Sequence, residues 1–342
     1  MTVGAADAAG PGVLRSALVD GLGRVHRDLR ISLTDRCNLR CTYCLPADGV
    51  PWLGSSTLLS LTETVRVARV AVERGVDQIR LTGGEPLLRP DVVDVVAALA
   101  DLPGRPEVTM TTNGIRLGRL ARPLVEAGLS RVNVSLDTVD RERFARLTRR
   151  DRFDEVLAGL DAADEAGLTG TKTNSVLLRG VNDDEVCDLV RFAHGRGYEP
   201  RFIEQMPLDA GRTWARSQMV RGDEVLAWLR DDFDLVELPG RRSAPAQRWQ
   251  VRGTASTVGI IASVSRPFCG ACDRIRLTAD GQLLGCLFAT AETDVRALLR
   301  RGGSDDEIAA ALGLTVLAKA AGHTIAEPGF DQPGRPMSAI GG

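Results

Sequence analysis

The stretch DLRISLTDRCNLRCTYC, residues 28–44, joins a short β-rich run to three closely spaced cysteines. The first seven residues predict a strand, so that Cys37, Cys41 and Cys44 fall in the loop after its carboxyl end. Parallel α/β folds place their chemistry in such loops. Three thiolates can hold a four-iron cluster while one iron remains open to a small molecule. A zinc site is the alternative, but zinc needs a fourth protein ligand to complete its tetrahedron.

Outward from this stretch, β-rich runs alternate with amphipathic helical runs, which is the pattern of consecutive βα units around a parallel sheet. The sequence therefore predicts an α/β fold, a partial, TIM-like barrel of six βα units rather than eight. The expected strands cover 28–34, 77–83, 107–113, 131–137, 171–177 and 200–206.

We expect a flexible leader over residues 1–22, the partial barrel over 23–240, and a C-terminal extension over 241–342 that carries a second cysteine group and a Gly-Gly tail. After Met206 the pattern becomes irregular, apart from a helix near 222–233 and two helices near the C-terminus. Ser304 suits the N-cap of the second of these helices. The run RRDR at 149–152 is expected to be a solvated turn.

Composition narrows the class of protein. The formal charge of −2 and the pI of about 6.0 give no general attraction to nucleic acid. No apolar run reaches the roughly 18 residues of a membrane span, and the first residues do not resemble a signal peptide, so we expect a cytoplasmic protein without membrane contact. Six of the seven cysteines fall into two tight groups, which favours metal ligands over disulfides; Cys187, the seventh, is expected to be an ordinary buried thiol.

The second group is Cys269-x2-Cys272-x13-Cys286, again a set of three thiolates. A structural zinc knuckle is a serious alternative, but the missing fourth cysteine suggests a second cluster with an open iron facing the substrate. Between these ligands, Arg274 and Arg276 would share one face of a strand and form an anion clamp.

The motif TDRCNLRCTYC resembles the signature of radical S-adenosylmethionine (radical SAM) enzymes, and LTGGEPLL at 81–88 resembles their glycine-rich motif. The resemblance implies that the methionyl amino and carboxylate groups of S-adenosylmethionine chelate the open iron. Tyr43 would pack beside the adenine, and the backbone of Gly83 to Glu85 would approach the methionyl amino group. Reductive cleavage of the cofactor would then give a 5′-deoxyadenosyl radical that abstracts a hydrogen from the substrate.

The run CGACDRIRLTADGQLLGCLF at 269–288, the first cysteine motif and the terminal SAIGG are together similar to the GTP 3′,8-cyclase family over about residues 22–342. This resemblance implies two [4Fe–4S] clusters, S-adenosylmethionine as cofactor and GTP as substrate. The product would be 3′,8-cyclo-7,8-dihydro-GTP, the first intermediate of molybdenum cofactor biosynthesis. It also implies an electron donor, a homodimer, and a cyclic pyranopterin monophosphate synthase that takes up the product.

The same resemblance assigns site residues. The positions that match nucleotide contacts are Arg30, Arg80, Thr111, Lys172, Arg201 and the segment Arg274, Ile275 and Arg276. Gly84, Ser135 and Met206, together with Tyr43, match contacts to S-adenosylmethionine. Arg274, Arg276 and the tail residues Gly341 and Gly342 match the catalytic end of the substrate site, into which the family's double-glycine tail reaches.

Two other classes stay open on the sequence. A radical maturase acting on a peptide also carries auxiliary clusters after a partial barrel, although usually with more cysteines. An electron carrier or a zinc-dependent nucleic-acid-binding protein would not need the glycine-rich motif, and a nucleic-acid binder should show a basic excess.

Overall fold

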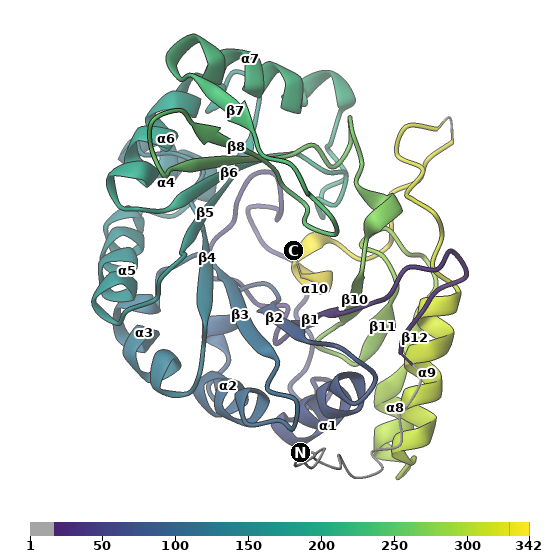
Figure 1. Ribbon diagram of the computed structural model, residues 1–342. Coiled ribbons are helices and arrows are strands. Elements are labelled where there is room, and N and C mark those ends of the chain that lie inside the picture. The colour runs from purple at the N-terminus through teal and green to yellow at the C-terminus, as the bar shows by residue number, and fades with distance from the viewer. Residues whose placement is uncertain (1–16, 328, 342) are drawn as a thin grey trace, which may run out of the picture.

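The computed structural model describes residues 17–327 and 329–341. A single curved sheet organises this part of the chain, with strand order β12-β11-β10-β1-β2-β3-β4-β5-β6-β9-β8-β7. Its central run, from β10 through β1–β6 to β9, consists of parallel neighbours, and antiparallel strands continue it at both ends. Figure 1 looks into this curve, with helices on the outer side and the C-terminal helix α10 inside it.

Each of the six strands expected from the sequence corresponds to an observed strand. They are β1 (Asp28–Ser32), β2 (Gln78–Thr82), β3 (Glu107–Thr112), β4 (Arg131–Ser135), β5 (Lys172–Leu177) and β6 (Glu199–Glu204). The helices among and after them are α1 (Leu61–Val72), α2 (Val92–Ala100), α3 (Leu117–Glu126), α4 (Arg141–Thr148), α5 (Phe153–Glu165), α6 (Val186–Gly195) and α7 (Gly222–Asp232). Short 3-10 turns lie at η1 (Pro86–Leu88), η2 (Asp183–Glu185) and η3 (Arg216–Gln218).

Local chemistry accounts for these elements. Helix α1 begins with a capping box, in which Ser60 accepts from the backbone N–H of Glu63 and the Glu63 side chain accepts from that of Ser60. Its apolar residues Val67, Val70 and Ala71 recur at helical spacing and are buried. The buried faces of α1–α3 and α5 pack on the outer face of the parallel strands in one continuous apolar core.

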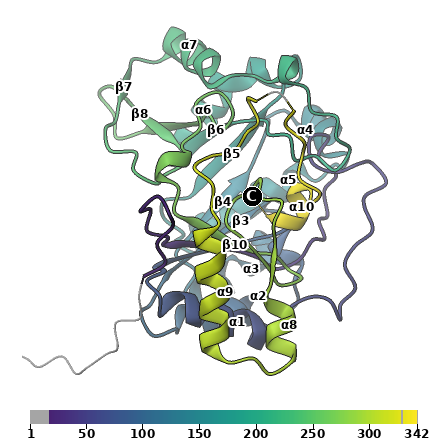
Figure 2. The same cartoon turned by 90° about the vertical axis from the view of Figure 1, so that its right-hand side faces the viewer.

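The chain after α7 is more regular than the sequence suggested. It forms β7 (Leu235–Glu237), β8 (Gln247–Val251), β9 (Thr257–Ile261), the turn η4 (Cys269–Ala271), β10 (Arg274–Leu277), β11 (Gln282–Leu284) and β12 (Thr293–Asp294), followed by α8 (Val295–Arg300), α9 (Asp305–Leu317) and α10 (Met337–Ile340). The predicted N-cap of α9 is confirmed, since Ser304 accepts from the backbone N–H of Glu307. Figure 2 shows α8 and α9 side by side below β10.

The N-terminal segment is folded from residue 17 onward. Leu18 and Asp20 are buried, and Val19 forms a β-bridge with Val25. The expected leader, residues 1–22, therefore includes six residues that belong to the fold, while residues 1–16 lie outside the described part. Over that described part, no helix is both long and apolar enough to cross a membrane.

Candidate active site

A cavity of about 300 Å³ lies inside the curve of the sheet and gathers most of the residues that the sequence singled out. The predicted residues that line it are Arg30, Cys37, Cys41, Tyr43, Cys44, Arg80, Gly84, Thr111, Ser135, Arg201, Met206, Arg274 and Arg276. Residues far apart in the chain thus share one concave surface, as a ligand site requires. Lys172, Ile275 and the three cysteines of the second group do not line it, although Phe268 and Leu287, next to two of those cysteines, do.

The first cysteine group occupies the loop after β1. The backbone N–H of Cys44 donates to the Cys41 carbonyl (2.9 Å), and that of Leu39 donates to the Cys37 sulfur (3.4 Å). Arg149 secures the loop from outside by donating to the carbonyls of Arg40 (3.2 Å) and Leu45 (2.9 Å). The expectation of a merely solvated turn at 149–152 is therefore wrong for Arg149, which is half-buried and helps to hold the loop.

The glycine-rich motif after β2 packs directly against this loop. The backbone N–H of Gly84 donates to the Thr34 carbonyl and that of Glu85 to the Arg36 carbonyl, both at 2.7 Å. A Cβ on Gly84 would lie 2.3 Å from the Arg36 oxygen, so no side chain fits there. We expected these glycines to allow close approach to the cofactor; within the protein, they allow close approach of the cysteine loop.

The Glu85 side chain ties the ends of two strands together. It is buried and accepts from the Thr112 hydroxyl (2.7 Å), the backbone N–H of Asn113 (2.7 Å) and the backbone N–H of Leu87 (3.0 Å). Sequence reasoning gave only its backbone a role. The carboxylate instead fixes the edge of the cavity between β2 and β3.

Burial disfavours the charged form of the thiols in the first group. Burial raises the pKa of Cys37 to about 11 and of Cys44 to about 12, and the other thiols of the group add to the shift at Cys44 and Cys41. Ionising three such thiols would be costly without a cation, and iron coordination supplies one. Across the described residues, no group of three or more His, Cys, Asp or Glu could hold a single metal ion. In a four-iron cluster each cysteine binds a different iron, so its ligands need not converge on one point.

Tyr43 and Asp137 form a buried pair on the wall of the cavity. The Tyr43 hydroxyl donates to Oδ2 of Asp137 at 2.7 Å, and burial raises the pKa of Asp137 to about 6. Asp137 follows Ser135 at the carboxyl end of β4, where its position could have marked it in the sequence. The pair fixes the phenol ring beside the first cysteine group.

Deeper in the cavity, the strand register brings arginines together. Arg30 on β1 is the register partner of Arg80 on β2 and of Arg276 on β10, and Asp28 is the partner of Arg274. Burial lowers the pKa of Arg30 and of Arg276 to about 9, and of Arg80 to about 10; neighbouring arginines add to each shift. This is a site with excess positive charge.

Three of these arginines each have one buried donor without a protein acceptor. The buried Nε atoms of Arg30, Arg80 and Arg274 have no hydrogen-bond acceptor. Asp28, which sequence reasoning missed, lies between them, with Oδ2 3.8 Å from Nε of Arg30 and 3.7 Å from Nε of Arg274. Buried donors without acceptors are rare in native proteins, so an anionic ligand fits here.

The far wall carries Arg201 and, just outside the lining, Lys172. Arg201 donates through Nε to Glu199 at 2.6 Å. Burial, and after it the charges of Arg201 and Arg131, lowers the pKa of Lys172 to about 7. Its charge therefore depends on what approaches it near neutral pH.

The second cysteine group lies behind β10. As expected, Arg274 and Arg276 share a face and both line the cavity, whereas Ile275 points the other way and is fully buried in the apolar core. Nη1 of Arg274 donates to the sulfur of Cys272 at 3.5 Å, so this arginine connects the cysteine group to the cavity. Burial alone would raise the pKa of Cys272, but the charges of Arg274 and Lys319 hold it below its ordinary value.

The C-terminal tail lies within the curve (Figure 1), where Met337 and Ser338 line the cavity and Gly341 lies beside it against Arg276. The carbonyl of Gly341 accepts from Nη1 of Arg276 at 2.6 Å, and the carbonyl of Ile340 accepts from the Ser32 hydroxyl at 2.5 Å. Gly341 is buried with φ of 83°, and a Cβ there would lie 2.5 Å from both Ser32 and Thr82. Gly342 lies outside the described residues.

Comparison with known proteins identifies the family of the chain. The model of the radical SAM superfamily matches residues 31–193, and the model described as Molybdenum Cofactor Synthesis C matches residues 198–325. The GTP 3′,8-cyclase of Mycobacterium sp. (strain KMS) is 57% identical over 327 residues, covering 95% of this chain and 93% of the relative. The GTP 3′,8-cyclase of Streptomyces coelicolor is 56% identical over 328 residues, covering 95% and 96%.

Among solved structures, the fold is similar to that of Streptococcus suis SuiB bound to S-adenosylmethionine, with a TM-score of 0.58 and 16% identity. The likeness covers 78% of this chain, and the chain spans 63% of the length of that structure. At this level of identity the likeness concerns the α/β radical SAM fold alone. The sequence relatives go further: the chain belongs to the radical SAM superfamily and, within it, to the GTP 3′,8-cyclase family.

Proposed function

We propose that this protein converts GTP to 3′,8-cyclo-7,8-dihydro-GTP, using S-adenosylmethionine and two [4Fe–4S] clusters, one on each cysteine group. The observation that carries the proposal is a single cavity that joins the first cysteine loop to a layer of arginines, three of which have a buried Nε without a protein acceptor. A triphosphate brings several negative charges, and guanidinium groups bind phosphate oxygens with matched geometry.

The two ends of the cavity bind different molecules, the cofactor at one end and the nucleotide at the other. At the carboxyl ends of the strands, the Tyr43–Asp137 pair, Gly84, Ser135 and Met206 form the surface for S-adenosylmethionine beside Cys37, Cys41 and Cys44. Bound there, the cluster and the cofactor would supply a carbon radical able to take a hydrogen atom from a substrate.

Within the strands, Arg30, Arg80, Arg276 and Arg201, with Thr111 and Lys172, hold the nucleotide. Their fixed strand positions orient the ribose toward the cofactor end, and the curved sheet around the cavity limits the access of water to a reactive intermediate. Gly341 adds a carbonyl that aligns Arg276.

The arginine layer also argues against the peptide alternative. A peptide backbone offers no concentrated negative charge, whereas the buried donors here require it. The zinc alternative needs a fourth protein ligand, and neither cysteine motif contains a fourth cysteine.

The proposal also includes the other expectations that the sequence resemblance and composition gave. They are the homodimer, the electron donor, delivery of the product to a cyclic pyranopterin monophosphate synthase, the cytoplasmic location, and the division of the chain at residues 240 and 241. The second cluster itself is supported by the three thiols of Cys269, Cys272 and Cys286 and by the donors that face their sulfurs.

The test is an anaerobic reaction of the reconstituted protein with S-adenosylmethionine, a reductant and GTP deuterated at ribose C3′. We expect 5′-deoxyadenosine that carries the deuterium, together with a cyclised nucleotide. Cys41→Ala should abolish both products, while Cys187→Ala, which removes the cysteine outside both groups, should retain them. Formation of 5′-deoxyadenosine without label and without a nucleotide product would refute GTP as the substrate.

A further inference from the structure

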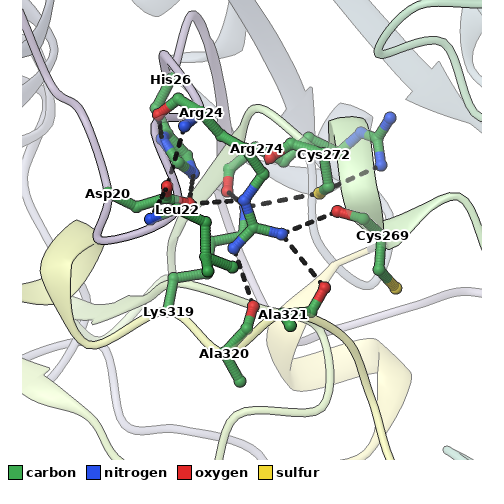
Figure 3. A network of polar contacts seen from close by, with 10 residues as sticks. All are labelled: Asp20, Leu22, Arg24, His26, Cys269, Cys272, Arg274, Lys319, Ala320 and Ala321. Atoms are coloured by element: carbon green, nitrogen blue, oxygen red, sulfur yellow. Dashed lines mark hydrogen bonds and ion pairs between the residues drawn. The ribbon is translucent and has the colours of Figure 1, made fainter.

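Three segments that are distant in the sequence meet beside the second cysteine group (Figure 3). They are the N-terminal segment 17–27, the turn η4 that carries Cys269, and the residues after α9, from 318 to 322. Two buried cations, Arg24 and Lys319, make the contacts between them. Neither cation lines the cavity, so the nucleotide site does not account for them.

Lys319 directs its hydrogen bonds to residues in and next to the second cysteine group. Its Nζ atom lies 3.4 Å from the sulfur of Cys272, 3.2 Å from the Cys272 carbonyl and 2.8 Å from the Arg274 carbonyl. An ammonium group has three donors, so these contacts use its full capacity. The residue is 8% exposed and is one of two lysines in the chain.

Arg24 braces the same region from the N-terminal segment. Its Nη1 atom donates to the carbonyls of Cys269 (2.7 Å) and Ala321 (3.2 Å), and its Nη2 atom donates to the Ala320 carbonyl (2.8 Å). Asp20 pairs with its Nε atom at 2.5 Å, and both side chains are buried. The brace therefore joins the backbone of Cys269 to the residues that follow Lys319.

The position of the ammonium group has a chemical consequence. A simple structural tie would need only the two carbonyl contacts, but Lys319 also reaches the sulfur of a cysteine. Hydrogen bonds to ligand sulfurs, and net charge near them, set the reduction potential and the retention of an iron–sulfur cluster. The added positive charge favours the reduced cluster, which carries one more negative charge.

We propose that Lys319 is a positioning residue for the second cluster: it orients the Cys272 thiolate and raises the potential of the cluster bound there, while Arg24 holds the peptide that carries Cys269. This inference rests on the proposed second cluster, which the experiment below tests separately.

The experiment isolates the second cluster in the full chain by replacing Cys37, Cys41 and Cys44 with Ala. In this background, anaerobic reconstitution should leave about four irons per chain, with the spectrum of one four-iron cluster. Absence of that cluster would refute the second cluster of the proposed function, independently of Lys319.

Lys319→Gln is then added, because its amide can still donate to the carbonyls but carries no charge. The reduced cluster should become about tenfold less favoured, which for a one-electron couple is a shift of about 59 mV toward negative potential in a titration followed by electron paramagnetic resonance. A chelator should remove the iron about tenfold faster. Lys319→Arg should restore most of both properties.

The matched control is Lys172→Gln, the same change at the other lysine, which should leave the potential unchanged without nucleotide. Circular dichroism of the iron-free proteins reports whether Lys319→Gln folds. If it does not, two comparisons of the cluster potential still test the contact. The first compares Lys319→Arg with the parent protein, and the second compares Arg24→Lys with Lys319→Arg. An unchanged potential and an unchanged rate of iron loss in a folded Lys319→Gln protein would overturn the proposal.

Discussion

At the scale of single residues, Lys172 offers a pH-dependent test of the nucleotide site. Burial lowers its pKa to about 7, so in the free protein a large share of this lysine is neutral near pH 7. A bound triphosphate favours the ammonium form of Lys172 and so raises its pKa. At pH values between the pKa of the free protein and that of the complex, GTP binding is therefore accompanied by uptake of a proton. GTP affinity should therefore be highest below about pH 7 and fall as pH rises above it, by up to about tenfold per pH unit.

Titration calorimetry in two buffers of different ionisation enthalpy measures this proton uptake directly. Lys172→Arg keeps the positive charge at all relevant pH values, so the GTP affinity of this variant should depend less on pH. Its proton uptake on binding should fall to the part that comes from the ionisation of GTP itself. Identical proton uptake by both proteins would show that Lys172 does not respond to the nucleotide.

Some site residues could be predicted from the sequence and others could not, because the two kinds are identified by different features. The six cysteines and the Arg274–Arg276 pair were predictable because spacing along the chain identifies them. Asp28 and Glu85 were not, because their roles come from partners on other strands, such as Arg274 for Asp28 and Thr112 for Glu85. Ile275 shows the converse: it lies within the matching motif, but strand alternation buries it in the core.

At the scale of elements, the contact between the glycine-rich motif and the first cysteine loop is open to a direct test. In Gly84→Ala the new Cβ meets the backbone oxygens of Arg36 and Asp35 at 2.3 and 2.4 Å. We expect a loss of about 1–3 kcal/mol in the free energy of unfolding by urea, because backbone atoms must move to relieve the overlap. The reconstituted protein should also lose iron from the first group.

Gly195→Ala is the matched control, since a Cβ at Gly195 meets nothing within 4 Å. This change should leave both the unfolding free energy and the iron content close to those of the parent. If Gly84→Ala behaved in the same way, the close packing of the two loops would not matter for holding the cluster.

The elements of the first half were largely predictable, and those of the second were not. The six strands up to β6 were placed within two residues at each end, because each short apolar run is followed by an amphipathic helix. Strands β7, β8 and β9 were missed since the Pro-, Arg- and Gly-rich stretch before β8 hides their pattern. The pairing of β9 with β6, and of β8 with β9, depends on long-range register, which local sequence does not encode.

At the scale of the whole molecule, the tail brings the last residues of the chain to the first strand. Deletion of Gly341 and Gly342 should abolish formation of the cyclised nucleotide, because Arg276 loses the carbonyl that aligns it. Gly341→Ala should do the same, because its Cβ would lie 2.5 Å from Ser32 and Thr82 and would displace that carbonyl. Iron content, circular dichroism and GTP binding should persist, since the cysteines and the other arginines remain. Product assays together with GTP titrations separate these effects.

Gly334→Ala serves as the control for the tail, because a Cβ at that position meets nothing within 4 Å. It should retain turnover. Normal turnover by the shortened protein would show that the tail does not take part in the reaction.

The family and the general architecture were within reach of the sequence, since the motifs are specific and the βα pattern is regular. The shared cavity was not, because it depends on how β10 and the tail close against β1. That pairing has a consequence for how the protein is made. Asp28 meets Arg274, and Arg30 meets Arg276, only after most of the chain has left the ribosome. Such non-local pairing folds slowly, so a nascent chain can assemble its cofactor end before β10 and the tail complete its nucleotide end. Enzyme that has emerged only in part therefore has a place to generate a radical but an unfinished site for the molecule that should receive it.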